Sequence, residues 1–129
     1  MTTPIQSIRY PEERRMASVL FADVHGFTAL AESQDYEAIS ELIKEVWVRL
    51  DTIIESNGGY IDKHIGDAVM AVWGAPYAGE GDAERAVTTA LKLQESIKEY
   101  TRSSVRPGAR ELKLRVGVNT AFVLAGYVG

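Results

Sequence analysis

The positions of apolar and polar residues predict a chain of short strands and longer helices. Residues 16–22 form an almost continuous apolar run of strand length. Continuous apolarity is typical of a strand covered on both faces, so we expect this strand at the centre of a sheet. Residues 1–15 are polar, contain Pro4 and Pro11 and show no period. They predict a flexible lead-in before a domain over residues 16–129.

Two later stretches have the three- and four-residue spacing of amphipathic helices. The first is expected to begin after the capping residue Asp35 and to end at Asn-Gly-Gly, residues 57–59. The second is expected to begin at the cap Asp82 and to end near Thr101. A short helix is also predicted over residues 27–32. The predicted apolar stripes are Tyr36, Ile39, Ile43, Val46, Leu50, Ile53 and Ile54 in the first helix, and Ala83, Ala86, Val87, Ala90, Leu93 and Ile97 in the second.

A hairpin is predicted where the apolar runs 60–65 and 68–73 flank Gly66-Asp67. A two-residue connector that contains glycine indicates a tight turn, because glycine tolerates positive φ. Residues 112–118 then alternate between apolar and polar, which predicts a strand with one solvated or ligand-facing side. Residues 121–128 are expected to form a further, final strand.

This order of elements predicts an α+β domain. Strand, helix, two strands, helix and strand form the ferredoxin-like βαββαβ arrangement, a mixed or antiparallel sheet with both helices on one face. Sheet-forming residues continue to Gly129 with no returning strand or helix, which would leave a sheet edge uncovered. We therefore expect the C-terminal part of the domain to be missing from this sequence.

The composition is that of an ordinary folded domain, with 46% hydrophobic and 25% charged residues among 129. A formal net charge of −4 argues against a nucleic-acid-binding surface. The lack of cysteine excludes disulfides and thiolate metal sites, whereas oxygen-ligand metal sites remain open. No apolar run has the length of a signal peptide core or a membrane span, so we expect a soluble, cytoplasmic chain without membrane association.

Two aspartates are the first candidates for chemistry. Asp23 ends the first strand, and Asp67 lies in the hairpin turn, where Gly-Asp is also an ordinary turn pair. The βαββαβ topology places this strand beside the hairpin, so the carboxylates should approach and repel each other unless a cation lies between them. Mg²⁺ or Mn²⁺, which prefer oxygen ligands, would suit such a pair. The glycine-containing turn over residues 24–28 could then hold phosphates.

Lys63 is open to two interpretations. By strand alternation it is expected to share a face with Ile61 and Ile65. Edge lysines commonly extend along apolar neighbours, but the ammonium could also donate to a ring nitrogen or carbonyl of a base. His25, His64 and the two tryptophans are expected to serve in packing or turns.

At these residues the sequence resembles the catalytic domain of the class III adenylate/guanylate cyclases, most nearly the bacterial form. The resemblance covers nearly the whole chain from Arg14 onward, and three motifs in register are far more specific than any one of them. The motifs are FADVHGFT at residues 21–28, GGYIDKHIGDAVMAVWGAP at residues 58–76 and LRVGVNTAFVLAGYVG at residues 114–129.

The resemblance implies a role for each matching position. Asp23 and Asp67 match the two metal-binding aspartates, with the Val24 carbonyl as a further ligand, and the metals would be two Mg²⁺ or Mn²⁺ ions per site. Lys63 matches the position where lysine favours adenine and glutamate favours guanine. The implied function is therefore an adenylate cyclase that converts ATP to cyclic AMP and pyrophosphate at the interface of a head-to-tail homodimer. The segment that holds the phosphates would comprise His25, Gly26, Phe27 and Thr28.

The sequence also departs from the family pattern. Ala121 stands where a glycine commonly follows the Asn-Thr pair. In the family, the second base-selecting residue and the asparagine and arginine that assist catalysis lie beyond the last motif, so we expect this chain alone to have little or no activity. One alternative is a non-catalytic nucleotide-binding or dimerisation module with the same fold. Another is a two-metal enzyme such as a diguanylate cyclase, which fits the fold but not the flanking motifs.

Overall fold

The computed structural model describes residues 13–26, 35–75, 78–106 and 108–125. The short helix predicted at residues 27–32 lies outside these ranges, as do residues 1–12. None of the helices described is long and apolar enough to cross a membrane. The elements are β1 (Glu13–His25), α3 (Tyr36–Ser56), β2 (Tyr60–Ile65), β3 (Ala68–Trp73), α4 (Asp82–Ser103), a short 3₁₀ helix (Ala109–Glu111) and β4 (Lys113–Ala125).

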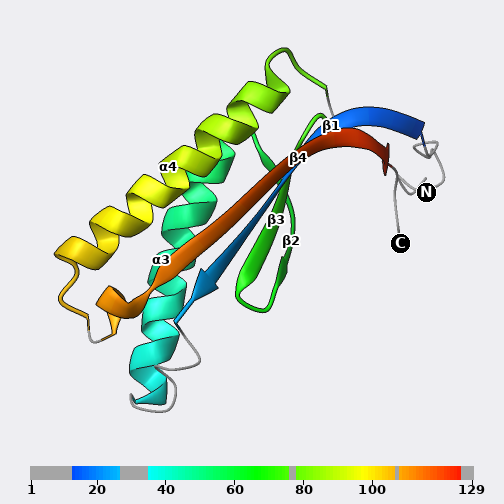
Figure 1. Ribbon diagram of the computed structural model, residues 1–129. Helices are drawn as coiled ribbons and strands as arrows, with labels where there is room; N and C mark the ends of the chain where they lie inside the picture. Colours follow the sequence, from blue (N-terminus) through cyan, green and yellow to red (C-terminus); the bar gives the residue numbers. More distant parts are fainter. Residues whose placement is uncertain (1–12, 27–34, 76–77, 107, 126–129) are drawn as a thin grey trace.

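The strands form one antiparallel sheet in the order β2-β3-β1-β4. Both long helices lie on the same side of this sheet (Figure 1). β1 is central, between β3 and β4, as the apolar run predicted. The βαββαβ prediction is confirmed, and the hairpin has the predicted bounds on both sides of Gly66-Asp67.

The core lies between the sheet and the two helices. In β1, Leu20, Ala22 and Val24 alternate towards the helices and are at most 2% exposed. Full burial of an aliphatic side chain stabilises a fold by roughly 1.5–3 kcal/mol, so this face accounts for much of the stability. The other core residues from the long elements are Ile39, Leu42, Val46, Leu50, Ile54, Val69, Ala71, Trp73, Ala86, Leu93, Ile97, Tyr100 and Leu114.

The two long predicted helices are confirmed, but parts of their stripes and one cap are wrong. Tyr36 is 84% exposed because it is the first residue of α3, before the turn in which Ile39 reaches the core. Val87 is 51% exposed, because one helical step turns it about 100° away from the buried Ala86. The cap of α4 is Gly81 rather than Asp82.

Residues 112–118 and 121–128 do not form two strands within the described part of the chain. β4 is continuous to Ala125, and its pairing with β1 continues through Thr120 opposite Ser18 and Ala121 opposite Ala17. The hydroxyls of Ser18 and Thr120 are 2.6 Å apart and form a hydrogen bond. The predicted break fails because this pairing across the sheet keeps the backbone extended.

The sheet face opposite the helices, called the open face below, has no described element over it. Phe21 on β1 and Ile65 on β2 are 50% and 56% exposed. The expectation that β1 is covered on both faces is therefore wrong for the described residues. The apolar run of β1 was misleading because only its alternate residues face the helices.

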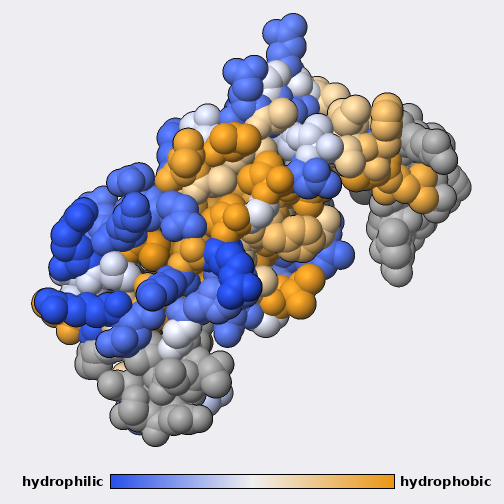
Figure 2. All heavy atoms as spheres, viewed as in Figure 1, coloured by the Kyte–Doolittle hydropathy of each residue, from blue (hydrophilic) through white to orange (hydrophobic). Residues whose placement is uncertain are grey.

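The joined ends of β1 and β4 extend past the helices as a two-stranded arm (Figure 1). Apolar side chains continue along this arm, where Met16 lies opposite Phe122. Met16, Phe122 and Leu124 are 49%, 70% and 67% exposed. Figure 2 shows the arm largely in the colours of apolar residues. An apolar strand pair that no described residue covers indicates a surface suited to contact with another chain.

Glu45 on α3 binds residues at the end of α4 and in the loop that follows it. One Glu45 carboxylate oxygen accepts a hydrogen bond of 2.7 Å from the Tyr100 hydroxyl, and the other accepts one of 2.8 Å from Arg106 Nε. The hydrogen bond from Tyr100, followed by that from Arg106, lowers the pKa of Glu45. Burial, with the Glu45 hydrogen bond as a second cause, raises the pKa of Tyr100. These contacts fix the chain just before it enters β4.

Glu45→Gln should destabilise the fold at neutral pH by up to ~1 kcal/mol, because this pair is partly exposed and screened by solvent. A lowered folded-state pKa contributes stability above the ordinary glutamate pKa and loses it as pH falls through the folded value. The difference between wild type and variant in urea unfolding should therefore shrink between about pH 5 and pH 3. Glu55→Gln, at an exposed glutamate of the same helix, is the control. A difference that stays constant with pH would contradict the assignment.

Candidate functional site

The end of β1 meets the β2–β3 turn, as the topology predicted. The Val24 amide donates a hydrogen bond of 3.0 Å to the Asp67 carbonyl. Asp23 is opposite Ala68, the residue that follows Asp67, in the β1–β3 register. The structure therefore makes Asp23 and Asp67 neighbours across two adjacent strands, although they are far apart in sequence.

Asp23 lies on the open face, two residues after Phe21. Its side chain is 44% exposed, and Asp23 Oδ2 is 3.3 Å from His25 Nε2. This contact is an ion pair only when the imidazole is protonated. The cross-strand neighbour of Asp23 on β4 is Arg115, which is exposed. A carboxylate that is half accessible to solvent can accept a further ligand.

The donor atoms at this edge fit a hard divalent cation. In an antiparallel pair, one residue directs its N–H and its C=O to the same neighbour. The Val24 carbonyl therefore faces the hairpin turn, as its amide does. Two carboxylates and one carbonyl leave positions for water or phosphate oxygens, as Mg²⁺ requires. The described ranges contain no group of three or more histidine, cysteine or acidic side chains that could hold a metal.

Gly26 turns the chain away from the end of β1. Its φ is +110°, and a Cβ atom there would lie 2.7 Å from the carbonyl oxygen of Glu111. A side chain at this position would be both strained and blocked by backbone, so the tight turn requires glycine. Phe27 and Thr28 lie outside the described residues, and the assignment of this segment to phosphates stays a prediction.

Lys63 lies on the open face, but not through simple alternation. Ile61 is opposite Ala71 in the core-facing row, whereas Lys63 is opposite Met70, with a bulge at the residue between them. The expectation that Ile61 shares a face with Lys63 is therefore wrong, because a bulge breaks the two-residue period. Lys63 Nζ lies 3.1 Å from Asp62 Oδ2, and its side chain is 54% exposed.

The packing roles expected of His64 and the tryptophans are confirmed. His64 Nε2 is 3.0 Å from Asp51 Oδ2 on α3, and its ring meets Trp47 edge to face with centroids 5.5 Å apart. Trp73 is 1% exposed, and its Nε1 donates a hydrogen bond of 3.0 Å to the Asn57 carbonyl. These side chains hold β2 and β3 against α3.

Sequence reasoning did not single out three polar residues: Arg115 and Asn119 on the open face of β4, and Asp62 beside Lys63. Arg115 and Asn119 are on the same side of β4 by register with Asp23 and Val19. The period-two pattern of β4 contained this signal, because it predicted a ligand-facing side. Asp62 had no such signal, because the bulge that brings it beside Lys63 depends on pairing with β3.

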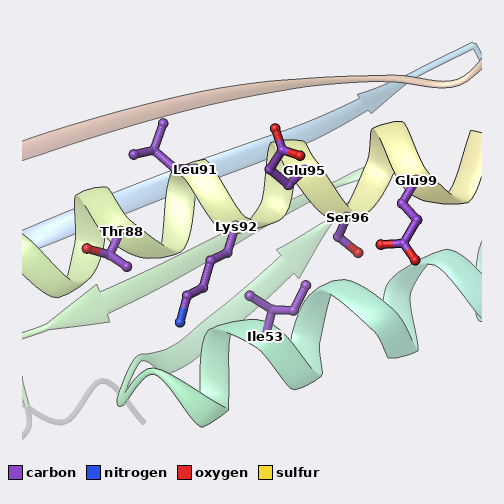
Figure 3. Close-up of a pocket in the computed structure, with 7 residues that line it drawn as sticks. All are labelled: Ile53, Thr88, Leu91, Lys92, Glu95, Ser96 and Glu99. Carbon is purple, nitrogen blue, oxygen red and sulfur yellow. The ribbon is translucent and has the colours of Figure 1, made fainter.

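Two hollows of the described surface lie away from the predicted site residues. A shallow pocket of about 420 Å³ between α3 and α4 is lined by Ile53, Leu91 and Lys92 among others. Figure 3 shows Lys92, Ser96 and Glu99 extending from α4 towards α3. Lys92 Nζ donates a hydrogen bond of 3.1 Å to Asn57 Oδ1, which ties it to the end of α3. No predicted site residue lines this pocket, whose other lining residues are Thr88, Glu95, Ser96 and Glu99.

Comparisons with known proteins agree with the fold. Residues 9–129 match the family model described as the adenylate and guanylate cyclase catalytic domain. The crystal structure of the guanylyl cyclase Cya2 is 29% identical, with a TM-score of 0.82 over 92% of this chain and 60% of that chain. The adenylyl cyclase CyaB from P. aeruginosa is also 29% identical, with a TM-score of 0.79 over 93% of this chain and 63% of that chain.

Relatives known by sequence include both kinds of cyclase. Adenylate cyclase 1 of Rhizobium meliloti (strain 1021) is 28% identical over 90% of this chain, and the speract receptor of Strongylocentrotus purpuratus is 35% identical over 92%. Receptor-type guanylate cyclase gcy-23 of Caenorhabditis elegans is 34% identical over 88%. The chain spans 17%, 10% and 10% of the lengths of these three relatives.

Proposed function

Because the chain belongs to the family of adenylate and guanylate cyclase catalytic domains, we propose that it converts ATP to 3′,5′-cyclic AMP and pyrophosphate. The observation that supports this best is the hydrogen bond of 3.0 Å from the Val24 amide to the Asp67 carbonyl. This bond joins two of the segments by which the sequence resembles the family. It places Asp23 and Asp67 at one edge of the sheet, where the phosphates of a nucleotide could bind.

In the proposed reaction, the ribose 3′ oxygen bonds to the α-phosphorus as the bond from that phosphorus to the pyrophosphate oxygen breaks. The hydroxyl loses its proton, and pyrophosphate leaves. Domains of this family generally use two divalent metal ions, and Asp23, Asp67 and the Val24 carbonyl would hold Mg²⁺ or Mn²⁺ here. Such ions lower the pKa of the hydroxyl and neutralise the charge of the triphosphate.

The preference for ATP over GTP rests on Lys63. Relatives of both specificities are similar to this chain, so overall similarity does not decide between them. Lys63 extends from the edge strand on the open face, and its side chain is 54% exposed, so its ammonium can donate hydrogen bonds to a ligand. An ammonium donates but cannot accept, so it suits the ring nitrogen N1 of adenine and opposes the N–H that guanine presents there.

Catalytic domains of this family act as dimers. We propose that this chain forms a head-to-tail homodimer in which the open face and the arm are covered by a second copy. The exposed Phe21 and Ile65 on the face, and Phe122 on the arm, support this arrangement because apolar side chains favour removal from water. A shared face would place the candidate residues of each chain against those of the other.

Asp23→Ala and Asp67→Ala should each lower the formation of cyclic AMP at least ~100-fold, since even partners outside the metal shell contribute 10–100-fold. The assay supplies ATP with Mn²⁺ to the whole polypeptide that contains these residues. Asp51→Ala is the control, because it removes a carboxylate of α3 that contacts His64 on the helix side of β2. ATP binding without product in the wild type would favour the non-catalytic alternative.

Lys63→Glu should move the preference from ATP towards GTP by at least ~10-fold in the ratio of kcat/KM values. A carboxylate accepts where the ammonium donates, so it suits the N–H at N1 of guanine and opposes the ring nitrogen of adenine. The measurement compares cyclic AMP and cyclic GMP formed from each nucleotide by wild type and variant. An unchanged ratio would show that Lys63 does not recognise the base.

A further inference from the structure

The bulge in β2 decides which face Lys63 occupies. Ile61 is opposite Ala71, whose row is buried beneath the helices, and Lys63 is opposite Met70 on the open face. Without an extra residue, a strand that directs Ile61 to the helices would direct Lys63 to them as well. Asp62 is that extra residue, because it has no partner in β3. It therefore turns Lys63 onto the open face.

The same bulge brings two consecutive side chains together. In a regular strand, neighbouring side chains point to opposite faces, but Lys63 Nζ lies 3.1 Å from Asp62 Oδ2. The two side chains are 54% and 38% exposed. An exposed pair of this kind contributes little to stability. Its effect is to restrict a long, flexible side chain whose ammonium would otherwise sample many positions.

Resting on the cyclase function proposed above, we propose that Asp62 is a positioning residue, which holds the Lys63 ammonium where it recognises the adenine base. One carboxylate oxygen of Asp62 occupies one of the three ammonium N–H groups, and the others remain for the base. Asp62 acts through Lys63 and not on the reacting atoms. Its removal therefore weakens the selection of ATP and leaves the chemical step intact.

A competing role for Asp62 follows from the place of β2 as an edge strand of the sheet. Charged residues on edge strands prevent the pairing of sheets between molecules. That role predicts more aggregation on loss of the charge and no change in the choice of nucleotide. The positioning role predicts a change in nucleotide choice that disappears when Lys63 has no ammonium.

The experiment measures kcat and KM for ATP and GTP in the whole polypeptide with Mn²⁺. Asp62→Ala should raise the KM for ATP about fivefold, the size an exposed charge pair allows, with kcat nearly unchanged. Asp62→Glu, which keeps a carboxylate in reach, should retain most of the wild-type preference. Asp51→Ala is the matched control, because Asp51 contacts the adjacent His64 on the helix side of the same strand. Thermal unfolding confirms that each variant is folded.

A double-mutant cycle completes the test. In a Lys63→Met background, Asp62→Ala should cause no further change in the KM for ATP, because the ammonium that it positions is absent. Additive effects of the two changes, or an ATP/GTP ratio within about twofold of wild type in Asp62→Ala, would overturn the positioning role.

Binding of ATP and GTP is measured by calorimetry in parallel. A wild type that forms no cyclic nucleotide overturns the proposed function, and the same comparison of Asp62 variants then rests on dissociation constants. A fivefold weaker affinity for ATP in Asp62→Ala alone would support positioning in that case. A wild type that binds neither nucleotide, or that shows no preference for ATP, overturns the inference about Asp62.

Discussion

The hydrogen bond from the Val24 amide to the Asp67 carbonyl is the contact on which the candidate site depends. It ends the β1–β3 pairing at the hairpin turn. The end of β1 therefore lies directly beside the turn between β2 and β3. Val24 is fully packed on the helix side, and packing is stiff to small displacements. The core thereby fixes the backbone that presents Asp23 on the opposite face. The site is a consequence of the register and needs no flexible loop to assemble these two residues.

One face of the sheet packs in the core and stabilises the fold, whereas the open face carries the candidate site. Helices α3 and α4 bury the face that holds Leu20 and Ala71. The open face presents Asp23 and Lys63. The strand register positions Asp23, and the bulge at Asp62 turns Lys63 onto this face. The bulge interrupts regular strand geometry, which costs stability locally and is compensated by the core behind it. Substitutions on the open face should therefore change nucleotide chemistry more than folding.

Much of this arrangement follows from local sequence. The apolar runs around Gly66-Asp67 predicted the hairpin with its bounds, and the element order predicted that Asp23 and Asp67 are neighbours. Features that depend on pairing between distant segments were missed. The continuity of β4 comes from Ser18 and Thr120 across the sheet, and the bulge at Asp62 exists only relative to β3. Periodicity within one segment contains no information about such partners. The prediction for Lys63 was therefore right about Ile65, which shares its face, and wrong about Ile61.

The location of a bound metal ion tests the account most directly. Mn²⁺ with ATP, titrated into the 129-residue chain, broadens the NMR signals of nearby backbone amides whether or not turnover occurs. The account predicts that the amides of residues 23–26 and 66–68 broaden first, and that Asp23→Asn with Asp67→Asn removes the effect. Broadening that begins elsewhere, for example at the acidic residues of α4, or that persists in the double variant, would contradict a metal site at the junction of β1 and the hairpin.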